Sequence, residues 1–146
     1  MKPTDIIELF SFEKDYYRTT VEDFFRRYNI NLVNYNQEIK LKDKQYISSG
    51  IDTKTAIKSI YKTMADTYQF FIEDFLILEV AENQLVYTNN GVKPIHEAKD
   101  IYDAKLNKYY EIKKSMYIGY KEHYNIKVGK PYAFMNNKGL LFNTGK

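Results

Sequence analysis

The chain has 146 residues, with 22 Lys or Arg against 19 Asp or Glu, and it contains no cysteine. This length suits a single domain whose core can be large enough to fold without a metal, and the missing cysteines exclude disulfides, thiol nucleophiles and metal–thiolate sites. Asp5 and Glu8 interrupt the apolar stretch that a secretory signal needs, and no apolar run approaches the length of a membrane span. These features predict a cytoplasmic protein that makes no membrane contact.

The first 50 residues are predicted to form short N-terminal helices followed by short strands. Thr19 to Glu22 has the spacing of a capping box, so we expect a helix to start near Thr20. Its buried stripe would contain Val21, Phe24, Phe25 and Tyr28. From Ile30 onward the pattern loosens toward alternation, which favours short strands or a loop rich in Asn and Lys.

Residues 53–83 show the strongest periodicity in the chain. Apolar residues recur at three-and-four spacing from Ile57 to Leu78, which predicts a long amphipathic helix, with Asp52 as its cap. Its second half is apolar nearly all round, so we expect it to be the central buried helix.

Residues 84–93 and 125–146 are each predicted to form a hairpin, because Asn-Asn-Gly and Asn-Asn-Lys-Gly turn signals lie between short apolar runs. Between them, Pro94 opens a second long amphipathic helix over residues 94–124. The predicted fold is therefore a single α+β domain over residues 1–146, predominantly helical, with two long amphipathic helices packed against short N-terminal helices and small β-hairpins.

Charge is segregated along the chain. Residues 105–146 carry nine Lys against two Glu, a net charge of +7, whereas residues 1–104 carry thirteen basic against seventeen acidic residues, a net charge of −4. Aromatic residues are interleaved with these lysines, and such a pattern favours a polyanion with stackable bases. The predicted nucleic-acid contacts are Lys105, Lys108, Lys113, Lys114, Lys121 and Lys127, with Tyr109, Tyr117 and Tyr120 as stacking or packing residues.

The sequence contains only partial matches to catalytic motifs. His96-Glu97-Ala98-Lys99-Asp100 resembles a zinc-binding helix with Asp100 in place of the second histidine, and Asp103 would share its face. A solvated helix start explains the same residues, so we predict no metal, no cofactor and no catalytic residue. Adjacent carboxylates, such as Glu73 and Asp74, point in different directions on a helix and are expected to be structural.

A helix-turn-helix over residues 20–39 is a further alternative, with its turn at Asn29 to Asn31. Phe25, Tyr35 and Glu38 do not match the small or aliphatic residues expected at the packing positions of that motif.

The sequence thus predicts a non-enzymatic regulatory protein that binds nucleic acid or a nucleoprotein complex through its basic last third. The Lys-rich and Asn-rich composition is typical of a low-GC bacterium or its mobile elements. The alternative is an adaptor or inhibitor that binds a protein partner through its amphipathic helices, with a homodimer left open, and a metal-assisted enzyme is a third interpretation.

Overall fold

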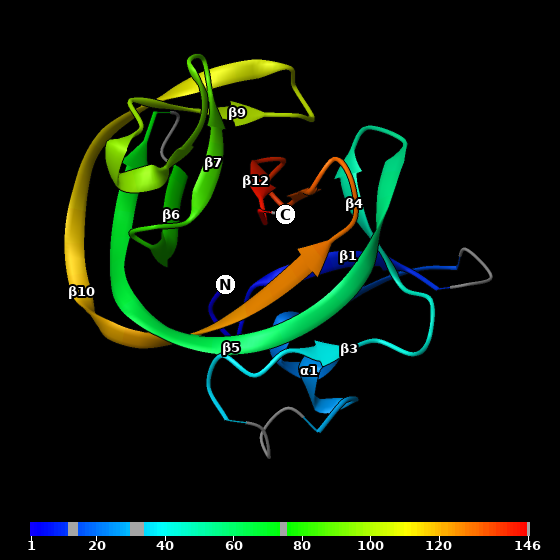
Figure 1. Cartoon of the computed structure of the whole chain (residues 1–146). Helices are drawn as coiled ribbons and strands as arrows, with labels where there is room; N and C mark the ends of the chain where they lie inside the picture. Colours follow the sequence, from blue (N-terminus) through cyan, green and yellow to red (C-terminus); the bar gives the residue numbers. More distant parts are fainter. Residues whose placement is uncertain (12–14, 30–33, 74–75, 146) are drawn as a thin grey trace.

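The computed structural model describes residues 1–11, 15–29, 34–73 and 76–145, and it shows a protein made mostly of β-strands (Figure 1). The predicted helical α+β fold is therefore wrong. The elements in chain order are β1 (Ile6–Phe10), β2 (Tyr16–Thr20), α1 (Val21–Arg26), β3 (Ile39–Lys40), β4 (Tyr46–Gly50), β5 (Thr53–Ile72), β6 (Leu76–Ala81), β7 (Leu85–Thr88), β8 (Gly91–Pro94), the 3-10 helix η2 (Ile95–Glu97), β9 (Asp100–Asp103), β10 (Lys108–Val128), β11 (Ala133–Met135) and β12 (Leu141–Asn143).

Two long antiparallel strands, β5 and β10, form the frame of the molecule. They pair from Ile57 with Val128 to Ile72 with Ile112, and the pairing shifts register at three places in β10. Each shift inserts or skips a residue, which bends the strand and increases its twist. The ribbon consequently curves into a horseshoe, and the two chain ends lie on its concave side (Figure 1).

Residues 53–73 and 76–83 form no helix, because apolar side chains of this segment lie on both faces of a long strand. β5 is rich in Thr, Ile, Tyr and Phe, the β-branched and aromatic residues that favour strands. Its buried residues alternate from Thr55 through Ile57 to Ser59, and further along Ile60 and Phe70 are buried too. A strand that is covered first on one face and then on the other produces a mixed pattern that resembles helical spacing.

Residues 94–124 do not form the predicted long helix either. Pro94 ends β8, the residues after it make the 3-10 helix η2 and β9, and the segment from Lys108 onward lies in β10. Residues 113–117 of β10 are all exposed, so successive side chains on both faces of the strand meet solvent. The alternation that marks a buried strand appears only near its end, at Tyr124, Ile126 and Val128.

The remaining strands attach to this frame. The eight-stranded sheet has the order β2-β1-β4-β5-β10-β9, with β3 and β6 paired to other stretches of β5. A four-stranded sheet has the order β11-β12-β7-β8. The residues of the two expected hairpins form β7 with β8 and β11 with β12, and a bridge between Asp103 and Leu140 links the sheets.

The helix expected to start near Thr20 is confirmed as α1, whose first turn is capped by the Thr20 hydroxyl accepting the N–H of Asp23 at 3.2 Å. Phe24 and Phe25 are fully buried on its inner face, and the ring of Phe25 packs on Tyr124 of β10 with centroids 4.8 Å apart. The helix thus closes one side of the core against the horseshoe. Residues 30–33, at the turn of the helix-turn-helix alternative, and Asp74 lie outside the described residues.

No helix in the described part of the chain has the length and apolar character needed to cross a lipid bilayer.

The contact between α1 and β10 predicts a large loss of stability for Phe25→Ala. Emptying a fully buried aromatic site costs about 3–5 kcal/mol of the free energy of unfolding, which is a large part of what a domain of this size has. Ile51→Ala, at a residue 60% exposed, is the matched control and should stay within about 0.5 kcal/mol of the wild type. Urea denaturation measures both, and near-equal midpoints would contradict the placement of α1 in the core.

Candidate functional site

The predicted nucleic-acid contacts lie along one strand rather than on one face. Lys105 is in the turn before β10, and all the others are in β10 itself. From Lys108 to Lys127 the strand runs roughly 60 Å at about 3.3 Å per residue, and side chains along it alternate between two faces except at the register shifts. Tyr109, Tyr117 and Tyr120 are 46%, 52% and 63% exposed, but Tyr117 donates its hydroxyl to Asp66 at 2.9 Å.

Lys127 forms an intramolecular ion pair. Its ammonium forms an ion pair with Glu38, and that contact raises the pKa of the lysine. In the sequence, Glu38 drew attention only as a residue that does not match the helix-turn-helix pattern. The structure instead places it beside β10, where it neutralises one of the lysines of the basic last third.

The candidate metal ligands of the zinc-like motif are separated by the fold. His96 is exposed on η2, whereas Asp100 and Asp103 lie on β9, three residues apart and therefore on opposite faces. The Asp103 carboxylate accepts the N–H groups of Lys105 and Leu106 at 2.8 and 2.9 Å and the hydroxyl of Tyr110 at 3.0 Å. Asp103 is thus a structural residue of the turn between β9 and β10.

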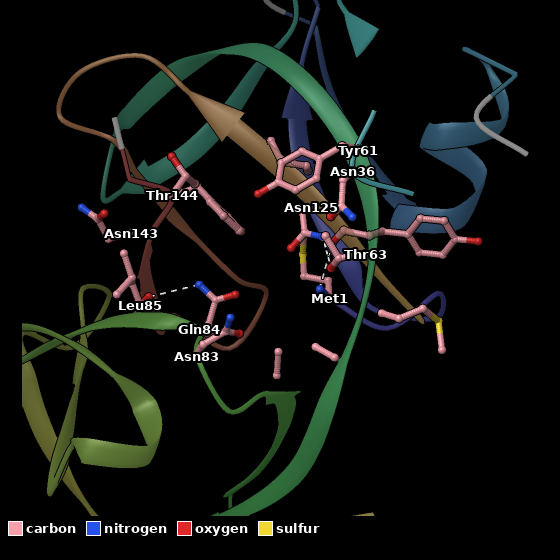
Figure 2. A pocket seen from close by; sticks show the side chains of 16 residues that line it. Met1, Asn36, Tyr61, Thr63, Asn83, Gln84, Leu85, Asn125, Asn143 and Thr144 are labelled. Carbon is pink, nitrogen blue, oxygen red and sulfur yellow. Dashed lines mark hydrogen bonds between the residues drawn. The ribbon is translucent and has the colours of Figure 1, made fainter. Parts of the chain in front are cut away.

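A polar cavity of about 350 Å³ lies between Met1 and the end of β12 (Figure 2). Its wall combines side chains from β5, β10 and β12 with the segment between β6 and β7. Amides and hydroxyls dominate its polar lining, which consists of Asn36, Tyr61, Thr63, Asn83, Gln84, Asn125, Asn143 and Thr144.

Met1 is fixed on one side of this cavity as a short continuation of the sheet. Its nitrogen donates to the carbonyl of Tyr124 at 2.9 Å, and the N–H of Tyr124 donates to the carbonyl of Met1 at 2.8 Å. Burial lowers the pKa of the Met1 amino group to about 6, against the opposing effect of the Asp5 carboxylate. Beside it, the Asn125 amide donates to the Thr63 hydroxyl at 2.8 Å and so links β10 to β5 along the cavity wall (Figure 2).

Asn143 and Thr144 form the other side, at the end of β12. The Asn143 amide is held at both ends, because its Oδ1 accepts the N–H of Gly145 at 2.8 Å and its Nδ2 donates to the hydroxyl of Tyr87 at 3.1 Å. The N–H of Thr144 donates to the carbonyl of Tyr132 at 2.8 Å. The peptide bond between Asn143 and Thr144 is thereby held on both sides.

The carbonyl that holds Thr144 belongs to a residue in an unusual conformation. Tyr132 has a φ of +67°, in the left-handed region that non-glycine residues seldom adopt, and its N–H donates to Gly129 at 2.7 Å. Such a conformation costs about 1–3 kcal/mol and persists only where the surroundings enforce it. Here it turns the Tyr132 carbonyl toward the backbone of Thr144.

The chemistry available in the cavity follows from these residue types. Met1 carries a thioether, which has no proton to lose and is not among the nucleophiles that form acyl intermediates. Hydroxyls are present on Tyr61, Thr63 and Thr144, and Asn143 supplies a carboxamide next to a main-chain carbonyl. None of these residues was predicted from the sequence, in which nothing distinguishes Asn143 from the other asparagines.

Comparison with known proteins relates the fold to one class. No protein-family model matches the sequence, and no curated protein does. The transcription factor IIB Mvu mini-intein is similar with a TM-score of 0.74 at 11% identity over 97% of both chains. The VidaL intein has a TM-score of 0.74 at 14% identity over 99% of this chain and 97% of its own. A DnaB intein from Synechocystis sp. PCC 6803 has a TM-score of 0.65 at 12% identity over 97% and 99%. The chain therefore has the fold of inteins over its full described length.

This likeness corrects the predicted function. The intein fold does not fit the predicted nucleic-acid-binding regulator, and the alternative adaptor relied on long amphipathic helices that the described residues do not form. Residues 105–146 do carry an excess of positive charge. They fold into β10 and the strands that follow, and the end of this segment lines part of the cavity.

His123 is buried on β10, next in sequence to Tyr124 of the cavity wall. Its Nε2 lies 2.6 Å from the Thr67 hydroxyl, which itself donates to the carbonyl of Ala65 at 2.9 Å. The Thr67 proton is therefore committed to Ala65, so Nε2 of the histidine must be the donor. Nδ1 then carries a bare lone pair, and among the described residues it has no partner.

Protonation of His123 would place an N–H at Nδ1 with no acceptor. Burial, with the nearby positive charges of the Met1 amino group and Lys121, lowers its pKa from 6.5 to about 4. Because the unfolded chain binds this proton more readily, the free energy of unfolding falls as the pH drops from 6.5 toward 4.

His123→Gln should remove this pH dependence while keeping a donor for Thr67. A shift of this size corresponds to about 3 kcal/mol at most, so between pH 7 and pH 4.5 the wild type should lose about 2–3 kcal/mol more than the variant. Urea denaturation at the two pH values measures the difference, with the exposed His96→Gln as control. Parallel losses in the wild type and His123→Gln would show that the histidine is not buried in its neutral form.

Proposed function

We propose that this chain is a self-processing domain that cleaves its own backbone after Asn143. Inteins are protein-splicing domains, and the fold shared with them supports a reaction of the chain on itself. The observation that carries the proposal is the position of Asn143, whose amide is held by Gly145 and Tyr87 while the following N–H is held by Tyr132.

The reaction is attack of Asn143 Nδ2 on the main-chain carbonyl carbon of the same residue. A new C–N bond closes a five-membered succinimide, and the bond from that carbon to the nitrogen of Thr144 breaks. The proton lost by Nδ2 is balanced by the proton gained by the Thr144 amine. The products are a chain that ends in a succinimide at residue 143 and a segment that begins at Thr144.

The contacts of Asn143 favour this reaction in two ways. Negative charge that develops on Oδ1 when Nδ2 loses a proton is stabilised by the N–H of Gly145 at 2.8 Å. The Tyr87 hydroxyl, 3.1 Å from Nδ2, accepts one of the amide hydrogens and fixes the side-chain rotamer.

The contact of Thr144 opposes the competing reaction of asparagine. In ordinary deamidation the next backbone nitrogen attacks the side-chain amide, and the chain stays intact. Here that nitrogen is held by its N–H to the Tyr132 carbonyl at 2.8 Å, which directs it away from the Asn143 side chain. The positions of these groups thus favour cleavage over deamidation.

Only this one cut is proposed. A cut at Met1 would need a nucleophile on that side of the cavity, and a thioether does not supply one. The reaction acts once on the chain that carries it, so the domain has no turnover and is not an enzyme in the usual sense.

Asn143→Ala should abolish cleavage of a fusion in which a reporter protein follows Lys146. The wild-type fusion, incubated at pH 7 to 9, should release a reporter that begins at Thr144, and intact mass spectrometry should find the other product one water lighter than the free acid. The exposed Asn137→Ala is the matched control and should cleave like the wild type. A wild-type fusion that stays intact over days, or an Asn143→Ala fusion that cleaves at the same bond, would overturn the proposal.

Tyr87→Phe should slow the same cleavage without stopping it. One lost neutral hydrogen bond is worth about 1 kcal/mol, so the first-order rate of reporter release should fall about fivefold. Tyr109→Phe, at an exposed ring that stacks on Tyr102, should leave the rate unchanged. Equal rates for Tyr87→Phe and the wild type would show that the Tyr87 hydroxyl does not orient the amide.

A further inference from the structure

The outer edge of β10 has an unpaired stretch that is bounded at both ends. Toward its start, β9 pairs with residues as far as Glu111, and the N–H of Ile112 donates to the carbonyl of Lys99 at 2.9 Å. Toward its end, Met1 pairs with Tyr124. Between these points, from Lys113 to Glu122, no described residue pairs with this edge. The gap is about 30 Å long at the rise of a strand.

The backbone groups along this gap point outward. Tyr124 directs both its N–H and its carbonyl toward Met1, away from β5. Alternate residues of a strand direct these groups to the same edge, so Glu122 and Tyr120 also present theirs outward, as far as the register shift between Tyr117 and Gly119. An extended chain can pair with them as it would with any sheet edge.

The need to keep a free sheet edge from aggregating does not explain why large apolar side chains are exposed along it. Lysines and β-bulges are common devices that keep a free edge from pairing, and both occur here. However, Met116, Tyr117 and Tyr120 are 50%, 52% and 63% exposed, and large apolar groups invite pairing rather than prevent it. Their exposure beside open backbone groups marks a surface that is covered by a partner.

The charge of the edge determines which partner fits. Lys113, Lys114 and Lys121 are exposed, and the stretch from 113 to 121 contains no acidic residue. At its end, Glu122 is already occupied by the Tyr35 hydroxyl at 2.6 Å and lies 3.9 Å from the Lys62 ammonium. A second copy is disfavoured, because its edge would bring the same three lysines against these three with no acidic residue in the stretch to meet them, and like charges across a strand pair are destabilising.

We propose that the gap between β9 and Met1 binds an acidic peptide segment in extended conformation, which adds to the sheet as a strand beside residues 113–122 of β10. Backbone pairing at Tyr120 and Glu122 holds the segment, and its carboxylates meet the lysines. The inference does not depend on cleavage at Asn143, since none of its residues contacts that asparagine.

The test uses the full chain and a fluorescent peptide of about ten residues with alternating Glu and Val. Fluorescence anisotropy at low salt should show binding that weakens as salt rises, and a Lys and Val peptide of equal length should not bind. Hydrogen exchange of the wild-type complex should show slower exchange at the amides of Tyr120 and Glu122. Absence of that protection, or equal affinity for the two peptides, would overturn the proposal.

A pair of variants at one position separates backbone pairing from side-chain contact. Tyr120→Pro removes the outward N–H without removing a hydrogen bond to β5, whereas Tyr120→Ala keeps it. The proline variant should bind the acidic peptide at least fivefold more weakly than the alanine variant, provided both melt at similar temperatures. Lys113→Glu with Lys121→Glu should weaken binding at least tenfold. A single-stranded oligonucleotide that binds more tightly than the peptide and responds in the same way to the lysine changes would assign the surface to nucleic acid and overturn the proposal.

Discussion

The antiparallel pairing of β5 with β10 is the interaction on which the rest of the structure depends. The other strands of the eight-stranded sheet attach to one of these two directly, or, for β1 and β2, through β4, and α1 packs its Phe25 on Tyr124 of β10. The three register shifts of β10 bend the pair. Without this bend the end of β12 and Met1 would not face one cavity, so the candidate site is a consequence of the curvature (Figures 1 and 2).

The sequence predicted local features better than long-range ones. The cap at Thr20 was predictable because it depends on residues within one helical turn. The fold class was not, since β5 buries side chains on both faces and so imitates a helical pattern, while its content of Thr, Ile, Tyr and Phe pointed to a strand. Pairs such as Tyr68 with Tyr117 join residues far apart in the chain, and no local pattern encodes them.

The candidate site could not be predicted for the same reason. The role proposed for Asn143 depends on Tyr87, on another strand, and that of Thr144 depends on Tyr132, whose positive φ no sequence rule assigns to tyrosine. The excess of positive charge in the last third was evident from the sequence, but where those lysines lie in the protein depends on the fold. On β10 the lysines follow a curved strand, and Lys127 is neutralised by Glu38.

A cut after Asn143 would leave the domain folded, which is what a self-processing site requires. β12 keeps its pairing with β11 through Phe142 and with β7 through Phe142 and Asn143, because these residues precede the cut. Departure of the released segment breaks the hydrogen bonds from the Thr144 N–H to Tyr132 and from the Gly145 N–H to Asn143, and it separates the Thr144 hydroxyl from the N–H of Val128, 3.4 Å away. The buried side chain next to the cut belongs to Phe142, 2% exposed, and it stays in the core. The hydrophobic core therefore holds the newly formed end in place, while the released segment leaves with few bonds to break.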